Sequence, residues 1–293
     1  MQDKPLVSVV IPCYNAEKYV EMAIRSIMNQ TYTNLEILII DDCSKDSTYE
    51  ILENLAKYDK RIILEKNEQN LKIVKTLNKL VLKANGKYIA RMDADDISAP
   101  NRIEKQVNFL ESNKDYGICG TNAWRIDCNN RMIGKSLLPT EDNEIKIVSD
   151  FFCVFYHPSV MIRSELYKKN LYREEYLYAE DMELWQRLLK VTKGKNLKEK
   201  LFYYRIISSS ASNNSISGAI QKTVTNSLCI DSDCSCLLLL KNKRLIGLIL
   251  WSKLHFSNDN KIRLNLKMRF CILLYILFRV YEKIIHKIIR HHI

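Results

Sequence analysis

The chain has 293 residues, of which 47% are hydrophobic and 27% are charged, so it is long and apolar enough to bury a full core. This composition excludes a disordered chain, and the presence of only seven glycines argues against a glycine-rich dinucleotide loop. The nine cysteines show no zinc-finger spacing, and no signal-peptide pattern precedes the first apolar run. We therefore expect reduced cysteines and a cytoplasmic setting.

The formal net charge of +11 is concentrated at the C-terminal end of the sequence. Residues 237–293 contain twelve Lys and Arg against two acidic residues, and so carry +10 of the total. Residues 208–217 are rich in Ser and Asn, which is typical of a loop or linker. We therefore divide the chain into a globular domain (1–207), a linker region (208–236) and a basic, apolar-faced helical tail (237–293).

Strand-like and helix-like segments alternate in the first part of the chain. Continuous apolar runs predict buried strands, and apolar residues at helical spacing predict helices. The expected strands are 6–11, 35–40, 62–64 and 88–92, and the expected helices are 19–28, 47–55 and 73–84. This alternation predicts an α/β fold with a mostly parallel central sheet.

After residue 96 the pattern is less regular. We expect helices at 100–112, 142–149 and 180–190, and strands at 117–127, 131–138, 160–163 and 201–206. No internal repeat is evident, so these elements are expected to complete the same domain.

The segment 91–96 places three carboxylates within four residues, directly after a predicted strand. Like charges this close raise one another's pKa unless a cation neutralises them, and Mg²⁺ or Mn²⁺ prefers carboxylate oxygens. A solvated acidic turn that caps the next helix would also explain the segment. However, the polar segments 12–15 and 41–42 also follow predicted strands, and the carboxyl ends of parallel strands meet at one edge of a sheet. Their convergence favours a site for a metal and a nucleotide diphosphate.

Four ordered segments resemble the motifs of family 2 glycosyltransferases, which have the GT-A nucleotide-sugar-binding fold. These segments are 8–15, 41–48, 93–96 and 179–181, and the resemblance extends over residues 5–206. It implies an inverting transfer of a sugar from a nucleotide diphosphate-sugar, most commonly UDP-linked, to a hydroxyl. It also implies that Mn²⁺ or Mg²⁺ assists the reaction.

The resemblance assigns the donor-binding roles by position. Pro12 and Tyr14 would line the base pocket, and Asp42 would hydrogen-bond the base. Asp93 would meet the ribose or base, and Asp95 would ligate the metal that bridges the two phosphates.

Four further residues are assigned around the reacting groups. Asp181 resembles the catalytic base, and Asp96 would support the metal site. His157 lies in a His-Pro-Ser stretch that resembles one near the acceptor in relatives, although a structural histidine is equally compatible with the sequence. Glu180 would orient the acceptor or cap its helix. An inverting transfer needs one carboxylate to take the acceptor's proton and a cation to stabilise the leaving diphosphate.

The sequence departs from the family pattern at Lys72. Relatives often carry Asn-x-Gly where this chain has Asn70, Leu71 and Lys72. A lysine there would either pair with the nucleotide's diphosphate or remain solvated.

The tail contains apolar runs that are shorter than the ~20 residues a bilayer span requires. Basic, apolar-faced helices are typical of segments that lie in the surface of an anionic membrane. A helical appendage packed on the globular domain, a dimer interface or a nucleic-acid patch would also account for the tail. The interleaved Leu and Ile runs favour a membrane, so no nucleic acid is expected as a partner.

The resemblance and the tail together imply a peripheral enzyme on the inner face of a bacterial membrane. There it would serve a glycan or lipid-linked acceptor in surface-polysaccharide synthesis, such as that of capsule, O-antigen or lipooligosaccharide.

Two other classes of protein fit the sequence less well. A dehydrogenase would need G-x-G-x-x-G after the first strand, where this chain has Pro12 and Cys13, and a phosphate loop GxxxxGK[ST] is also absent. A non-catalytic nucleotide-sugar- or membrane-binding module remains as an alternative, although the presence of both Asp95 and Asp181 favours an enzyme.

Overall fold

The computed structural model describes residues 4–136, 138–149 and 153–207. The strands form one nine-stranded sheet in the order β3-β2-β1-β4-β8-β6-β9-β5, with β7 paired to β6. The expected linker (208–236) and basic tail (237–293) lie outside the described residues. Within the described residues, no helix is long and apolar enough to cross a membrane.

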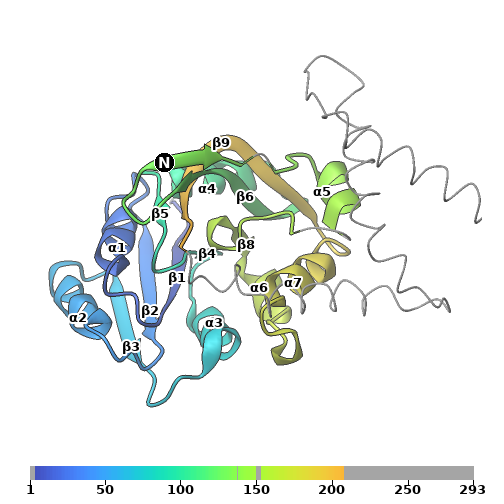
Figure 1. Ribbon diagram of the computed structural model, residues 1–293. Coiled ribbons are helices and arrows are strands. Elements are labelled where there is room, and N and C mark those ends of the chain that lie inside the picture. Colours follow the sequence, from blue (N-terminus) through green and yellow to red (C-terminus); the bar gives the residue numbers. More distant parts are fainter. Residues whose placement is uncertain (1–3, 137, 150–152, 208–293) are drawn as a thin grey trace, which may run out of the picture.

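The first half of the sheet confirms the predicted alternation of strands and helices (Figure 1). Four strands lie parallel to one another, and three helices connect them. The strands are β1 (Val7–Cys13), β2 (Leu35–Asp41), β3 (Ile62–Lys66) and β4 (Tyr88–Arg91), and the helices are α1 (Val20–Met28), α2 (Thr48–Tyr58) and α3 (Lys72–Lys83).

The second half of the sheet is mixed. Strand β8 is antiparallel to β4 and β6, and β9 is parallel to β6 and antiparallel to β5. Its strands are β5 (Ile97–Ser98), β6 (Tyr116–Ile126), β7 (Met132–Lys135), β8 (Met161–Arg163) and β9 (Lys193–Arg205). Its helices are α4 (Arg102–Ser112), α5 (Asp142–Ser149), α6 (Ser164–Lys169) and α7 (Glu180–Leu188), with 3-10 turns at His157–Ser159 and Glu174–Tyr176.

Three features of this half differ from the sequence expectations, and one of them is the two-residue strand β5, which was not expected. Strand β9 begins at Lys193 rather than at residue 201, because pairing with β6, and not an apolar run, holds its polar first half. Asn196 takes a buried position there and donates to the carbonyls of Pro139 and Val154, at 2.8 Å in each case. Helix α6 was not expected, because six residues are too few to show a helical period.

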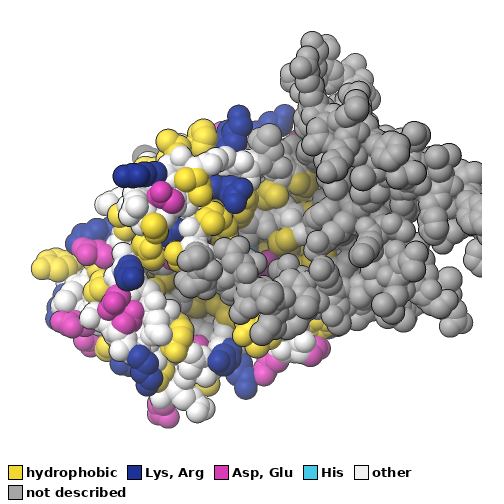
Figure 2. Space-filling model, in the orientation of Figure 1, with side chains coloured by type: hydrophobic (Ala, Val, Ile, Leu, Met, Phe, Trp, Pro, Cys, Tyr) yellow, Lys and Arg dark blue, Asp and Glu magenta, His cyan; other side chains and the backbone are white. Residues whose placement is uncertain are grey.

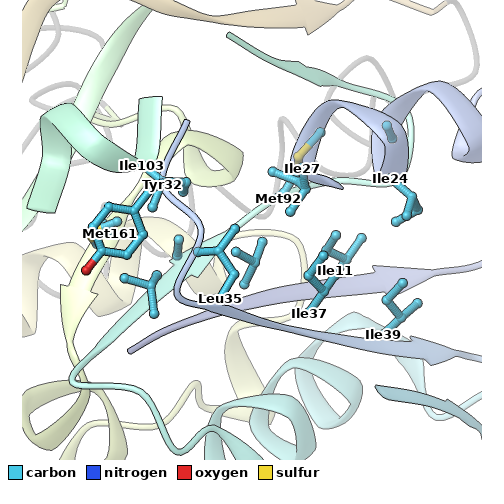
Figure 3. Packing of buried hydrophobic residues seen from close by; sticks show 14 of the residues in the cluster. Ile11, Ile24, Ile27, Tyr32, Leu35, Ile37, Ile39, Met92, Ile103 and Met161 are labelled. Atoms are coloured by element: carbon cyan, nitrogen blue, oxygen red, sulfur yellow. The ribbon is translucent and has the colours of Figure 1, made fainter. Parts of the chain in front are cut away.

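The core lies on both faces of the sheet. Along β1, Val9 and Ile11 pack on the face covered by α1, while Val10 packs on the face covered by α3. Figure 3 shows Ile24 and Ile27 of α1 above the β1 and β2 side chains of the first face. Burial of both faces explains why these strands are continuously apolar, and each fully buried aliphatic side chain contributes about 1.5–3 kcal/mol. The core therefore fixes the strand ends that carry the polar segments.

The surface of the described residues is mixed in charge on the face shown in Figure 2. Lys and Arg side chains are interspersed there with Asp and Glu. This agrees with the sequence, in which nearly all of the net charge belongs to the tail.

Candidate active site

The polar segments that follow β1, β2, β3 and β4 converge on one cavity of about 950 Å³. Residues from the 153–158 segment, the start of α7 and the end of β9 complete its walls. The structure thus brings together nine of the ten predicted site residues, namely Pro12, Tyr14, Asp42, Lys72, Asp93, Asp95, His157, Glu180 and Asp181. Asp96, the tenth, is buried behind the acidic segment.

Asp42 directly follows β2, and hydrogen bonds hold its side chain in the wall of the cavity. It is 4% exposed, and its Oδ1 accepts hydrogen bonds from Asn67 Nδ2 and from the backbone N–H of Leu71, both at 2.8 Å. Its Oδ2 is therefore the oxygen left for a ligand, and the half-exposed ring of Tyr14 provides an apolar wall of the same cavity. Asn67 was not predicted, although it directly follows the third strand, as the other site segments follow theirs.

Lys72 occupies an unusual backbone conformation at the start of α3. Its φ is 70°, in the left-handed region that favours glycine, and its N–H donates to Asn70 Oδ1 at 2.9 Å. This explains why glycine suits the position in relatives. A lysine in this conformation strains the backbone, and its side chain lines the cavity.

The acidic segment 93–96 gathers three carboxylates. Asp93, Asp95 and Asp96 have ligand oxygens within 4.8 Å of one another. Buried Arg91 pairs with both oxygens of Asp93, at 2.6 and 2.5 Å, so this carboxylate already has a cation. Among the described residues, no ion pair reaches Asp95, and burial together with the charge of Asp93 raises its pKa to about 6.

These carboxylates fit a hard divalent cation. Asp95 lines the cavity, where the charges of Arg91 and Arg205 only partly oppose the rise of its pKa, and Asp96 Oδ2 is buried without a hydrogen-bond partner in the described structure. Burial, followed by the charges of Asp95 and Asp93, also raises the pKa of Asp96. A bound Mg²⁺ or Mn²⁺ would relieve this repulsion, with Asp95 as the cavity-facing ligand.

Arg205, at the end of β9, holds the acidic segment in place through hydrogen bonds. It was not predicted as a site residue. Its N–H donates to Asp96 Oδ1 at 2.7 Å, and its Nε donates to the carbonyl of Asp95 at 2.6 Å. Its Nη1 donates to the carbonyl of Asp127 at 2.8 Å. The guanidinium lies 4.3 Å from the ring centre of Tyr19. From the sequence, Arg205 is expected near the end of the last predicted strand. That this strand ends beside residues 95 and 96 could not be predicted.

Asp181 stands in the first turn of α7 and faces the same cavity. Its Oδ1 accepts from the N–H of Met182 at 2.7 Å, and its Oδ2 accepts from the thiol of Cys153 at 3.3 Å. Burial raises its pKa, and the hydrogen bond from Cys153 opposes this shift. A carboxylate with a raised pKa is a stronger proton acceptor, as a general base requires. Cys153 was not predicted, because it is remote from Asp181 in sequence.

Glu180 lies beside Asp181 and is 8% exposed. Its Oε2 is buried without a partner, and burial followed by the charge of Asp181 raises its pKa to about 7. Near neutral pH a sizeable fraction of this side chain is therefore protonated and able to donate a hydrogen bond.

His157 lies in the cavity wall, in contact with a pair of buried tyrosines. Its Nε2 shares a hydrogen bond of 2.5 Å with the hydroxyl of Tyr172, which also bonds the hydroxyl of Tyr167. Burial, followed by the charge of Arg91, lowers the pKa of His157 well below its ordinary value, so the ring is neutral. Its ring packs edge-on against Trp185, which is buried in the core as the sequence favoured.

The family model described as "Glycosyl transferase family 2" matches residues 8–171. An uncharacterized glycosyltransferase of Haemophilus influenzae is 37% identical over 218 residues, covering 70% of this chain and 67% of that protein. The O-antigen biosynthesis glycosyltransferase WbnJ of Escherichia coli is 34% identical over 210 residues, covering 69% and 80%. The E. coli UDP-Glc:alpha-D-GlcNAc-diphosphoundecaprenol beta-1,3-glucosyltransferase WfgD is 32% identical over 189 residues, covering 64% and 71%.

Solved structures show the same fold. S. aureus TarS in complex with UDP-GlcNAc aligns with a TM-score of 0.63 and 19% identity, over 92% of this chain and 79% of TarS. The Pyrobaculum calidifontis mannosyltransferase PcManGT, in complex with GDP-Man and Mn²⁺, aligns with a TM-score of 0.63 and 15% identity, over 96% and 84%. The chain belongs to glycosyltransferase family 2, and its described part has the GT-A fold.

Proposed function

We propose that this chain is an inverting, metal-dependent glycosyltransferase that moves a sugar from a UDP-sugar to a hydroxyl of a glycan or lipid-linked acceptor. The observation that carries this proposal is the placement of two unlike acidic sites in one cavity. One is the carboxylate cluster at Asp95, which suits a cation, and the other is the desolvated carboxylate of Asp181, which suits a proton.

An inverting transfer is a single displacement. The acceptor oxygen forms a bond to the anomeric carbon while the bond from that carbon to the diphosphate oxygen breaks. Asp181 would accept the acceptor's proton, and the diphosphate would leave with the bonding electron pair. A divalent ion at Asp95 would supply charge stabilisation for the leaving diphosphate. Asp42 Oδ2 and Tyr14 would hold the base.

The choice of UDP and of a lipid-linked acceptor is supported by relatives. WfgD is named for both UDP-Glc and a diphosphoundecaprenol acceptor, and WbnJ is named for O-antigen biosynthesis. We therefore place this chain in bacterial surface-polysaccharide synthesis, as a peripheral enzyme at the cytoplasmic face of the membrane. The basic tail predicted from the sequence suits that location.

A panel of nucleotide-sugars tests the proposal. Thermal shift with and without Mn²⁺ identifies the donor, and release of UDP from it, alone and with bacterial lipid extract, measures cleavage and transfer. We expect metal-dependent stabilisation by a UDP-sugar and UDP release that lipid extract increases. Binding without any cleavage would instead support the non-catalytic module, and preference for another nucleotide would overturn the choice of UDP.

A further inference from the structure

The hairpin formed by β6 and β7 carries an exposed apolar tip. Residues 128–135 are all exposed, and β7 pairs with no strand other than β6 in the described part of the sheet. Met132 and Ile133 are adjacent in β7 and are 65% and 54% exposed. Neither side chain belongs to a hydrophobic core cluster of the described residues, and as neighbours in a strand they project from the two faces of the ribbon. Exposed apolar side chains gathered at one place can mark an interaction surface.

The same hairpin is basic. Arg125, Arg131 and Lys135 lie in the same hairpin as the apolar pair, with Arg125 and Lys135 on opposite faces of the ribbon, and no ion pair is formed by any of the three within the described residues. The one acid of the hairpin, Asp127, is engaged in its turn, because Oδ1 accepts from the N–H groups of Asn129 and Arg131 at 2.8 and 2.9 Å. Three cations against one acid therefore leave the hairpin that carries Met132 and Ile133 with a net positive charge.

An aromatic side chain stands at the base of the hairpin. Trp124 of β6 lies in one row with Lys135 of β7 and Tyr203 of β9, so these three side chains share a face of the sheet. The Nζ of Lys200 lies 4.8 Å from the centre of the Trp124 ring. Partly exposed Trp and Tyr with neighbouring Lys are typical of protein surfaces at the level of lipid headgroups.

The base of the hairpin also forms part of the rim of the active-site cavity. Tyr204, the register partner of Arg125, packs at 4.9 Å from the ring of Tyr156, and both tyrosines line the cavity. Arg205 connects the hairpin turn to the acidic segment through its bond to the carbonyl of Asp127. A surface that engaged the hairpin would thus lie close to the cavity.

We propose that the β6–β7 hairpin docks on an anionic lipid bilayer, with Met132 and Ile133 entering the headgroup region and Arg125, Arg131 and Lys135 facing lipid phosphates. Charge complementarity and the apolar tip together favour this partner. A second copy docked through the same patch would oppose like charges, and a nucleic acid would leave Met132 and Ile133 in water. The docking deepens the proposed function, since it would bring a lipid-linked acceptor to the cavity.

Vesicle binding by the full chain tests this docking. The probes are vesicles of phosphatidylcholine with 30% phosphatidylglycerol and vesicles of phosphatidylcholine alone. We expect Arg131→Gln with Lys135→Gln to weaken binding to the anionic vesicles ~30-fold, since each cation near such a surface contributes about fivefold. Met132→Ser with Ile133→Ser is expected to weaken binding at least tenfold. The matched control is Leu82→Ser with Val191→Ser, which removes two exposed apolar side chains elsewhere and should bind as wild type.

A tryptophan probe separates the hairpin from the tail. Ile133→Trp should be quenched by brominated lipids beyond the wild-type level, whereas Val191→Trp should not. Val191 precedes the start of β9, about 33 Å along the β6–β9 ladder from the hairpin turn. Equal quenching at both positions, or unchanged vesicle affinity in the hairpin variants, would overturn the proposal. Self-association that the hairpin variants abolish while vesicle binding persists would assign the patch to a second copy instead.

The failure of this proposal is distinguishable from that of the proposed function. The hairpin variants leave the residues of the cavity unchanged, so donor cleavage in solution should persist in them. If the wild-type chain binds vesicles through the hairpin but cleaves no nucleotide-sugar, the proposed transfer fails and the docking stands.

Discussion

The acidic segment after β4 and the acidic start of α7 face one cavity, yet the carboxylates in these two places have different neighbouring groups. In the segment 93–96, the guanidinium of Arg91 forms an ion pair with Asp93, and Asp96 accepts a hydrogen bond from the backbone N–H of Arg205. At α7, Asp181 accepts hydrogen bonds from a backbone N–H and a thiol, and no ion pair reaches it within the described residues. Both surroundings raise the pKa of their carboxylates, but in the segment 93–96 neighbouring carboxylate charges add to the effect of burial, a repulsion that a cation would relieve. At Asp181 the main cause is burial, which suits a group that takes up a proton.

The same contrast appears in the causes of the pKa shifts. The pKa of Asp95 is raised to about 6 by burial and then by the charge of Asp93, a repulsion that a divalent ion would relieve. The pKa of Asp181 is raised chiefly by burial. Among the described residues, the acids that cluster closely enough to hold a metal belong to the segment 93–96.

Replacement of Asp181 by Asn should have the largest effect. The loss of a general base typically lowers the rate by about 10²–10⁴-fold, while donor binding should remain, because the residues proposed to hold the base and the metal are unchanged. UDP release and thermal shift by the donor measure the two properties. Glu180→Gln is the matched control, since it removes the neighbouring carboxylate and should retain most of the rate. If the two variants exchanged phenotypes, Glu180 would be the base.

Replacement of Asp95 by Asn should abolish most metal-dependent donor binding. We expect Mn²⁺ affinity in the presence of UDP to fall by at least about 10–100-fold, the loss typical of groups that merely support a metal ligand. Electron paramagnetic resonance of free Mn²⁺ gives this affinity without any turnover. Glu17→Gln makes the same charge change in the same cavity and should bind Mn²⁺ as wild type. A normal Mn²⁺ affinity in Asp95→Asn would remove the distinction between the two acidic sites.

The sequence predicted the parallel half of the fold and most of the cavity for one physical reason. Buried parallel strands are apolar throughout, so the polar residues at their ends, such as Asp42 and Asp95, stand out in the sequence. Residues that act through long-range packing leave no such signal. Arg205 reaches residues 95 and 96 only because β9 pairs along the whole of β6, and Cys153 meets Asp181 only through the packing of α7.

Replacement of Cys153 by Ala should change the pH dependence of the rate. The thiol's hydrogen bond lowers the pKa of Asp181, so its removal raises that pKa and moves the acid limb of kcat/KM to higher pH. Activity should fall below the new pKa, where Asp181 is protonated, and should be unchanged well above it. Cys153→Ser keeps a donor and should keep the wild-type profile. An unshifted profile in Cys153→Ala would mean that the thiol does not act on the base.

Replacement of Lys72 by Gly or by Ala tests whether this side chain binds the donor, and we expect it to have the smallest effect of these replacements. Either change removes the ammonium, so both should weaken UDP-sugar binding by a similar factor, about fivefold for one ion pair of ~1 kcal/mol. Only Gly should also stabilise the fold, by about 0.5–1 kcal/mol, because it relieves the strain of a φ of 70° while adding some freedom to the unfolded chain. Urea unfolding and donor titration separate the two effects. Wild-type donor affinity in both variants would show that Lys72 is solvated, and the strained backbone would then serve the bond from Leu71 to Asp42 alone.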